Sequence, residues 1–276
     1  MRRVFFLSDF GSDSLYTAAV RAVLARKAPD VVVEDVTHSV PPQNVRHAAL
    51  LLEDFAPYLP SDALLLAVVD PGVGTSRRVI AVRTESLTAV APDNGLLETF
   101  LSGAKAIHAV TSQEIFLKPV SATFHARDVM APALAYLASG GEMESLGPAV
   151  SDPVRLELPR PVVKPGRVDG SVVAVDGFGN VATDIRAEHL FEAFETDDPL
   201  PLAGMAVLMV GDVQVYTFAR CYAEAPKGVP FALVGSFGRV EISLREGSAA
   251  GVLPSTPGTP VTIRVPQATA RFYREP

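Results

Sequence analysis

Three side chains that could act on a water molecule lie in two short stretches of the sequence. VVDPGVGTSRR (68–78) contains Asp70 and Arg77 around a glycine-rich loop, and TFHARD (123–128) contains His125. Asp and His can accept a proton, and Arg can stabilise developing negative charge. Taken singly, each also has an ordinary explanation: a turn-stabilising Asp, a surface Arg, and a His before a helix. The residue types therefore allow hydrolytic chemistry without requiring it.

The glycines of VVDPGVGTSRR do not match a phosphate-binding loop. A P-loop needs Lys and then Ser or Thr after its last glycine, whereas Thr75 and Ser76 follow Gly74. The dinucleotide fingerprint requires a third glycine where Arg77 stands, and it opens a helix. The β-branched run at 79–84 instead predicts a strand. We therefore expect the two glycines to turn the chain between two strands.

A second acidic stretch, SDFGSDS (8–14), follows the first apolar run of the chain. Asp9 stands just past that run, where a carboxylate is suited to accept hydrogen bonds from both hydroxyls of a ribose. Asp13 or Ser12 is expected to cap the helix that follows, because these side chains accept the free N–H groups of a first helical turn.

Two glycine-rich stretches in the second half of the chain, DGFGN (176–180) and GSFG (235–238), read as hairpin turns. The Phe in each is unusual for a turn, since an aromatic ring beside an open loop can lie on a flat base. Asn180 adds both donor and acceptor groups.

These stretches must be positioned by the elements around them. In the first half, apolar strand-length runs alternate with helical spacing, which predicts a largely parallel, Rossmann-like sheet with flanking helices. Ligands of such sheets lie beyond the carboxyl ends of the strands, where Asp9 and Asp70 stand. The expected strands are 3–7, 31–36, 63–69 and 79–84, and the expected helices are 14–28 and 45–59.

The sequence pattern changes after the first 150 residues. Five prolines fall between 148 and 166 and suggest an extended linker at 151–166. Beyond it, strand-like runs separated by Gly turns, with one short helix near 187–195, predict an antiparallel, barrel-like β domain. We therefore expect an N-terminal α/β domain at 1–150 and a C-terminal β domain at 167–276.

Composition narrows the class of partner. The 276 residues are 48% hydrophobic and carry a net charge of −7 without a basic run, which argues against nucleic acid and favours a small molecule. The N-terminal apolar run is interrupted before a signal peptide or a membrane span could be complete. Cys221 is the single cysteine; it fits a reducing compartment and is expected to be a buried thiol. We expect a cytoplasmic protein.

Taken in order, the motifs resemble a known family. SDFGSD, DVTHSVPPQNV, VVDPGVGTSRR, APDNGLLE, TFHARDVMAPA, VDGFGNVATDI and GSFGRVEIS resemble the S-adenosyl-L-methionine (SAM) hydroxide adenosyltransferases, or adenosine-forming SAM hydrolases, which are related to fluorinases and chlorinases. The resemblance implies hydrolysis of SAM to adenosine and L-methionine by attack of water on the ribose C5′, without cofactor or metal. It also implies a homotrimer with sites between the N-terminal domain of one subunit and the C-terminal domain of its neighbour.

The resemblance also implies roles for particular residues. Asp70, Arg77 and His125 match the set around the attacking water, and Asp9 matches the residue that holds the ribose diol. The other implied substrate contacts, on the adenine and methionine portions, are Asp13, Ser14, Phe124, Asp176, Phe178, Asn180 and Ser236, with Asp13, Ser14 and Asp176 at methionine-binding positions.

Two positions depart from the family pattern. Asp184 stands where Asn is common, and Ala126 stands where Gly is usual. The first leaves a contact of the β domain open.

Three other functions stay open at this point. A metal-dependent phosphohydrolase could use Asp9, Asp13, Asp70 and His125 as ligands. A SAM-dependent halogenase is disfavoured because the related halogenases have an uncharged residue where Asp70 stands, and a carboxylate repels halide. A nucleoside-binding module without turnover would need the same pocket.

Overall fold

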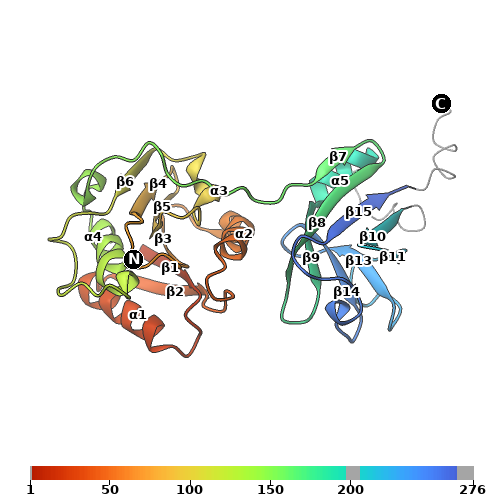
Figure 1. The fold of residues 1–276 in the computed structure, drawn as a ribbon, viewed down its shortest axis with the longest axis horizontal. Coiled ribbons are helices and arrows are strands. Elements are labelled where there is room, and N and C mark those ends of the chain that lie inside the picture. Colours follow the sequence, from red (N-terminus) through yellow and green to blue (C-terminus); the bar gives the residue numbers. More distant parts are fainter. Residues whose placement is uncertain (1, 197–205, 266–276) are drawn as a thin grey trace. The chain divides into compact units, whose positions relative to one another are not determined.

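The computed structural model describes residues 2–196 and 206–265. The chain divides into two compact units, Met1–Leu158 and Pro159–Pro276 (Figure 1). Within the described residues, no helix is both long enough and apolar enough to span a membrane.

The first unit contains a six-stranded sheet in the order β2-β1-β3-β5-β4-β6. Its strands are β1 (Arg2–Ser8), β2 (Val31–Thr37), β3 (Ala63–Val68), β4 (Val79–Arg83), β5 (Leu87–Pro92) and β6 (Ala106–Ala109). β1 is parallel to β2 and β3, and β3 is parallel to β5, whereas β4 is antiparallel to both β5 and β6. The predicted largely parallel α/β architecture is confirmed. The short strands β5 and β6 were not among the expected elements.

Helices cover both faces of this sheet because the central strands are apolar on both sides. Every residue of β3 is buried. One core joins α1 and α4 to the sheet, and a second core joins α2 and α3 to its opposite face (Figure 1). The helical elements are α1 (Leu15–Lys27), α2 (Val45–Phe55), the 3₁₀ turn η1 (Ala56–Tyr58), α3 (Glu98–Leu101), a π-helical turn η2 (Ala126–Met130), α4 (Ala131–Ala138) and the 3₁₀ turn η3 (Met143–Leu146).

The start of α1 differs from the expectation. Ser14, not Asp13 or Ser12, is the N-cap, and its hydroxyl oxygen accepts the N–H of Tyr16 at 3.1 Å. Ser14 has an extended backbone (φ −82°, ψ 136°) immediately before the first helical residue, which is the conformation that an N-cap requires. The prediction that Asp13 or Ser12 caps the helix is therefore wrong.

The proline-rich segment expected as a linker makes contacts with the first unit before Leu158 and with the second unit after it. Toward the first unit, Asp152 accepts from Arg78 at 2.8 Å, and Arg155 Nε donates to Glu98 at 3.0 Å. Toward the second unit, β7 (Val162–Lys164) pairs with the first long strand of the β sheet. Charged side chains and ladder pairing thus hold much of this segment against the two units.

The second unit is a nine-stranded sheet with a main apolar core and a smaller apolar cluster, and the predicted barrel-like β domain is confirmed. Its order is β11-β10-β15-β8-β9-β14-β13-β12, with β7 paired to β8. The remaining elements are β8 (Arg167–Val175), β9 (Val181–Arg186), α5 (Ala187–Phe194), β10 (Val207–Val210), β11 (Val213–Val215), β12 (Thr217–Phe218), β13 (Pro230–Val234), β14 (Arg239–Leu244), η5 (Ala249–Gly251) and β15 (Pro260–Arg264).

Two loops of the second unit bear on the sequence predictions. DGFGN joins β8 to β9 and GSFG joins β13 to β14, so both are turns between antiparallel strands, as predicted. Cys221 lies in the loop between β12 and β13 and is exposed, so the prediction of a buried thiol is wrong. Its surroundings are turn residues and not strand positions facing the core.

Candidate active site

A pocket of about 280 Å³ opens beyond the carboxyl ends of β1 and β3. β1 lies between β2 and β3, and the connections from β1 to β2 through α1 and from β2 to β3 through α2 pass over opposite faces of the sheet. Such a topological switch point is where ligands of open α/β sheets bind. Asp9 follows β1, Asp70 follows β3, and both line this pocket. Its volume is near the lower end of the roughly 300–1,000 Å³ found for small-molecule sites.

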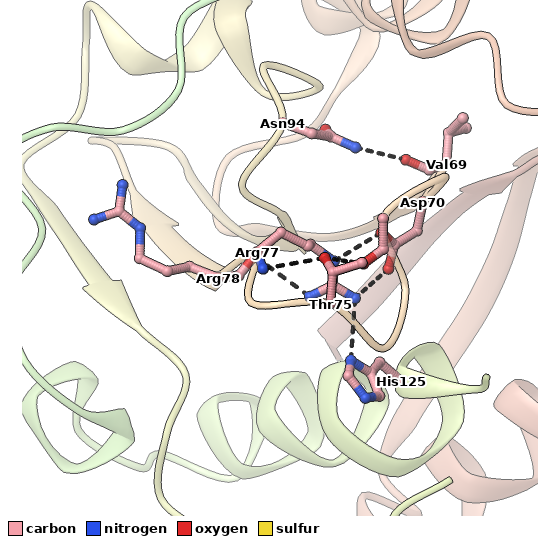
Figure 2. A network of polar contacts seen from close by, with 8 residues as sticks. Val69, Asp70, Thr75, Arg77, Arg78, Asn94 and His125 are labelled. Carbon is pink, nitrogen blue, oxygen red and sulfur yellow. Dashed lines mark hydrogen bonds and ion pairs between the residues drawn. The ribbon is translucent and has the colours of Figure 1, made fainter. Parts of the chain in front are cut away.

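Asp70 and His125 line this pocket, and Arg77 contacts both of their side chains (Figure 2). Arg77 Nε donates to Asp70 Oδ1 at 2.7 Å, while Nη2 donates to Asp70 Oδ2. The same Nη2 lies 3.1 Å from His125 Nδ1. The Asp70 and Arg77 side chains are largely buried. One guanidinium therefore links the carboxylate to the imidazole and leaves the group of three close to neutral.

The contact with Arg77 determines which His125 nitrogen carries the proton. A guanidinium only donates hydrogen bonds, so Nδ1 of His125 must accept, and in the neutral ring Nε2 carries the hydrogen. Burial lowers the pKa of His125, and the charge of Arg77 lowers it further, against the opposing effects of Asp70 and Asp128. His125 is thus a neutral ring at neutral pH with Nε2–H available as a donor.

The glycine-rich loop is shaped by one close approach. Gly74 has φ +78°, and a Cβ there would lie 2.3 Å from the carbonyl oxygen of Ala122. Only glycine tolerates both conditions, so this residue packs the Asp70–Arg77 loop against the segment that carries His125. Thr75 stiffens the loop, because its hydroxyl donates to Gly72 O at 2.7 Å and accepts from Arg77 N at 3.3 Å.

The neighbouring Arg78 has a different environment. It points away from the group of three (Figure 2) and binds Asp93 and Asp152 at 2.8 Å each. Asn94, next to Asp93, donates from Nδ2 to the carbonyl oxygen of Val69 at 2.9 Å. These contacts anchor the two ends of the loop, so that only Arg77 of the adjacent arginines contacts Asp70 and His125.

His125 is held by the π-helical turn that follows it. Within that turn, buried Asp128 accepts from Ser121 N at 2.8 Å and from Arg127 Nε at 2.6 Å. Burial acts to raise the pKa of Asp128, but the hydrogen bonds from Arg127 and Ser121 outweigh it and lower the pKa. An ionised Asp128 thus ties the loop before His125 to the turn after it. Single π turns of this kind are frequent at functional sites.

Aromatic side chains form one wall of the pocket. Phe124 is nearly buried, with its ring centroid 6.0 Å from that of Phe10 and 4.9 Å from that of Tyr16, both edge to face. Phe10 and Tyr16 also line the pocket. This wall is suited to the flat apolar parts of a ligand.

Asp9 has one oxygen engaged and one available. Its Oδ2 accepts the backbone N–H of Gln43 at 2.8 Å, and Gln43 itself has φ +63°. Among the described residues, no hydrogen bond reaches Oδ1 of Asp9. The carboxylate therefore holds a strained loop residue and retains acceptor capacity toward the pocket.

Asp13 and Ser14 do not line the pocket that contains Asp9 and Asp70. They border a second hollow of about 300 Å³, together with Arg21 and Asp35. The structure therefore separates these two predicted methionine contacts from the Asp70 group within this unit.

The other predicted contacts belong to the second unit. Asp176, Phe178 and Asn180 occupy the β8–β9 turn, and Ser236 is exposed in the β13–β14 turn. Phe178 is 83% exposed. A third pocket, of about 380 Å³, is lined by Phe178, Asn180 and Tyr222 with residues at the end of β14 and in the loop after it.

The two departures from the family pattern differ in position. Asp184 is buried in β9, where its oxygens accept from Ser171 N at 2.7 Å and Ser171 Oγ at 3.0 Å. The carboxylate of Asp184 therefore links β9 to Ser171 of β8 within the sheet. Ala126 lines the first pocket next to His125.

A metal centre would need several ligands to converge. Among residues 2–196 and 206–265, no three side chains of His, Cys, Asp or Glu come together as a metal-binding group. Of the ligands considered for a phosphohydrolase, Asp70 is engaged by Arg77, and Asp13 borders the other hollow.

Several lining residues were not predicted from the sequence: Phe10, Tyr16, Gln43, Thr123 and Tyr222. Phe10 lies within the SDFGSDS motif and Tyr16 follows it closely, which is a usable signal for these two. Nothing in the local pattern marks Gln43 or Tyr222, because they meet the pockets through loops distant in sequence.

Comparison with known proteins connects this geometry to a family. Residues 4–147 match the model of the SAM hydroxide adenosyltransferase N-terminal domain, and residues 170–262 match that of the C-terminal domain. An (R)-S-adenosyl-L-methionine hydrolase of Thermus thermophilus is 40% identical over 273 residues, covering 95% of this chain and 100% of the relative. A hydrolase of the same name from Salinispora tropica is 40% identical and covers 92% of this chain and 95% of the relative.

A more distant relative and a solved structure also match most of this chain. A fluorinase of Actinopolyspora mzabensis is 30% identical and covers 79% of this chain and 88% of the relative. The crystal structure of an uncharacterized conserved protein from Thermotoga maritima has a TM-score of 0.85 at 34% identity, and covers 95% of this chain and 99% of that chain. Because both domain models match in order and the relatives match along nearly their whole length, the chain belongs to the SAM hydroxide adenosyltransferase family.

Proposed function

We propose that this protein hydrolyses SAM to adenosine and L-methionine by in-line attack of water on the ribose C5′. The observation that carries the proposal is the contact of Asp70, Arg77 and His125 at the switch-point pocket. The names of the hydrolase relatives support the same substrate.

The tautomer of His125 determines which role each of the three residues can have in the reaction. With Nδ1 engaged by Arg77, His125 can donate from Nε2–H to the water oxygen, so it positions the nucleophile and does not take its proton. Asp70 accepts the proton, since each carboxylate oxygen keeps a lone pair beyond the one used by Arg77. Arg77 holds both groups and stabilises charge as the proton transfers.

Positioning supplies much of the rate. The sulfonium is already a good leaving group, so methionine departs without a general acid. Fixing water about 3 Å from the carbon and in line with the C5′–S bond can contribute roughly 7–11 kcal/mol. Exclusion of bulk water adds to this, because an oxyanion approaching a sulfonium neutralises charge at low dielectric.

The structure gives a reason to favour water over halide. Asp70 is an acceptor, and water can donate a hydrogen bond to it, whereas a halide ion cannot. The pairing of Asp70 with Arg77 offsets part of the simple charge repulsion, so the donor–acceptor mismatch is the stronger argument.

The first prediction concerns the products. Incubation with SAM of mixed configuration at sulfur, in ¹⁸O-labelled water, should yield adenosine and L-methionine in equal amounts, with ¹⁸O in the ribose 5′-hydroxyl. Liquid chromatography with mass spectrometry measures both. Adenine or S-adenosylhomocysteine as the main product would overturn the proposal, and intact SAM after prolonged incubation would favour a binding module. Loss of turnover on adding a chelator would favour the phosphohydrolase.

For the assembly, we further propose a homotrimer in which the first unit of one subunit meets the second unit of its neighbour. Exposed aromatic residues on both units support this: Tyr16 borders the first pocket, and Phe178 and Phe237 lie in the two hairpin turns. Aromatic residues are enriched at protein–protein interfaces relative to the rest of the surface.

The assembly has its own test. Dilution across the dissociation range, followed by sedimentation and by SAM turnover in the same samples, should show that activity disappears with the trimer. Specific activity that stays constant in a sedimenting monomer would contradict the shared site.

The proposed reaction consumes only SAM and water, so it requires no cofactor. The single Cys221 leaves no partner for an internal disulfide, which supports our proposal of a cytoplasmic location.

A further inference from the structure

The Asp70–Arg77 loop joins two strands that do not pair with each other. β3 and β4 are separated by β5, so the sheet itself does not fix the spacing between the two ends of the loop. β5 is parallel to β3 and antiparallel to β4, which places its last residues beside the end of β3 and the start of β4. The turn that follows β5, PDNG (92–95), therefore lies between the two ends of the loop.

Asn94 in this turn binds the first end of the loop. Its Nδ2 donates to the carbonyl oxygen of Val69, directly before Asp70, at 2.9 Å (Figure 2). Its Oδ1 accepts the backbone N–H of Leu96 at 3.2 Å. The amide thus uses its donor end on the loop and its acceptor end on its own turn.

Asp93 binds the residue that follows the loop. Its Oδ2 accepts from Arg78 Nε at 2.8 Å, and its backbone N–H donates to the carbonyl oxygen of Arg78 at 2.9 Å. That carbonyl oxygen also accepts from Arg77 Nη1 at 3.4 Å. The other carboxylate oxygen of Asp93 accepts the N–H of Val154 at 2.8 Å. Asp93 therefore holds both the main chain and the side chain of the residue next to Arg77.

Burial distinguishes the two acidic partners of Arg78. The side chain of Asp93 is 1% exposed, whereas that of Asp152 is 78% exposed. Water screens an exposed ion pair, so it contributes little, while loss of a buried partner leaves a charge uncompensated. The carbonyl oxygen of Asp152 also accepts from Arg78 Nη2 at 2.8 Å, and this contact does not depend on the carboxylate. Asp93 is thus the partner that fixes Arg78.

We propose that the two polar residues of this turn are positioning residues for the proposed reaction. By holding both ends of the loop, Asp93 and Asn94 fix where Asp70 meets the attacking water. Neither residue is among the described residues that line the switch-point pocket, so they act without touching the substrate. The inference rests on the proposed function for the roles of Asp70 and Arg77. A displacement of about 1 Å in a reacting group can cost on the order of 100-fold in rate.

Two variants of nearly unchanged shape each release one end of the loop. Asn94→Asp keeps the oxygen used within the turn but sets a second acceptor against the carbonyl oxygen of Val69. Asp93→Asn has one oxygen where Arg78 and the N–H of Val154 need two. Because other contacts of the loop remain, each variant should lower kcat for SAM hydrolysis by about tenfold and change the Kd of adenosine by less than about threefold.

Single-turnover rates and calorimetry with adenosine, both on the full-length protein, measure these quantities. Asp152→Asn is the matched control, because it alters the exposed partner of Arg78 and leaves both loop ends bound, so its kcat should equal that of the wild type. If Asp93→Asn does not fold, Asn94→Asp decides. An unchanged kcat, or a loss of adenosine affinity as large as the loss of rate, would overturn the proposal.

Combination with Asp70→Asn separates positioning from a general loosening of the structure. If Asp93 acts through Asp70, its loss matters little once Asp70 can no longer accept the proton. The double variant should therefore lie within about threefold of the kcat of Asp70→Asn alone, because mutations that act through one group are not additive. A further loss of about tenfold in the double variant would mean that Asp93 acts elsewhere, which would contradict the proposal.

The titration of His125 reports the position of Arg77 without any substrate. Burial lowers the pKa of His125 most, the charge of Arg77 lowers it further, and Asp70 and Asp128 oppose these effects more weakly. Movement of the Asp70–Arg77 pair away from the ring should therefore raise the pKa of His125 in Asp93→Asn, which NMR of the ring protons measures.

This titration separates the inference from the proposed function. A raised pKa of His125 in Asp93→Asn, with no SAM hydrolysis by the wild-type protein, would overturn the proposed reaction and support the positioning role. SAM hydrolysis by the wild type, with kcat and the pKa of His125 unchanged in both variants, would overturn the positioning role and leave the hydrolase in place.

Discussion

Asp70→Asn should lower kcat for SAM hydrolysis by about 100-fold or more while changing adenosine affinity by less than about threefold. The amide removes the proton acceptor. It also turns an N–H₂ group toward the Arg77 guanidinium, which both oxygens of Asp70 now bind. Single-turnover rates with excess enzyme, together with calorimetry using adenosine, measure the two quantities separately.

The ion pair of the adjacent Arg78 supplies a matched control. Asp152→Asn changes a carboxylate that pairs with Arg78 outside the pocket, so kcat should stay unchanged. Arg77→Lys is the companion variant, since it keeps a positive charge but cannot span Asp70 and His125 with one fork. Should Asp70→Asn lose adenosine affinity and keep its rate, VVDPGVGTSRR would be a ligand-positioning loop and the catalytic role would be wrong.

The parts of the fold that were predictable have strong local patterns. β3 is a continuous apolar run and α2 has clear helical spacing, so both elements were expected near their observed positions. β6 has four residues, and β5 ends in the Pro92 that opens a turn, which leaves little local signal. Because β5 lies between β3 and β4, the two strands joined by the Asp70–Arg77 loop are not neighbours in the sheet.

The candidate site was predictable as residue types and not as contacts. Placing Asp9 and Asp70 at strand ends required only the parallel pattern. The approach of His125 to Arg77 depends on Gly74 packing against Ala122, a contact between segments far apart in sequence. The capping of α1 by Ser14 was missed because Ser12, Asp13 and Ser14 have similar cap preferences, and only backbone conformation separates them.

The same limit applies to the hydrogen bonds of Asn180 with Asp176 and Tyr222. DGFGN is readable as a turn, and its Asp and Asn are typical of turns. Tyr222 joins them from a loop more than forty positions later, so no local pattern could show that both amide hydrogens are used. Resemblance assigned Asp176 by position, and the structure adds that both of its oxygens accept hydrogen bonds within the turn.

Asp9→Asn should weaken adenosine binding by roughly 1.5–3 kcal/mol, or on the order of 10- to 100-fold, with a much smaller effect on the rate of the bound complex. A carboxylate accepts charge-assisted hydrogen bonds from the two ribose hydroxyls, and an amide offers them a neutral oxygen and a donor. Asn is preferable to Ala here because its oxygen can still accept from Gln43 N, which Asp9 now holds at 2.8 Å. Removing that acceptor would release a residue with φ +63° and confuse loop disorder with lost ligand contacts.

A matched ligand isolates the contact to the ribose. 2′,3′-Dideoxyadenosine lacks both hydroxyls, so Asp9→Asn should change its dissociation constant by less than about twofold, while adenosine binding falls by the full amount. The difference between the two ligands is the coupling between the carboxylate and the diol. Equal losses for both ligands would mean that Asp9 acts by holding the Gln43 loop, because a loop displacement reaches the base and the sugar without regard to the hydroxyls.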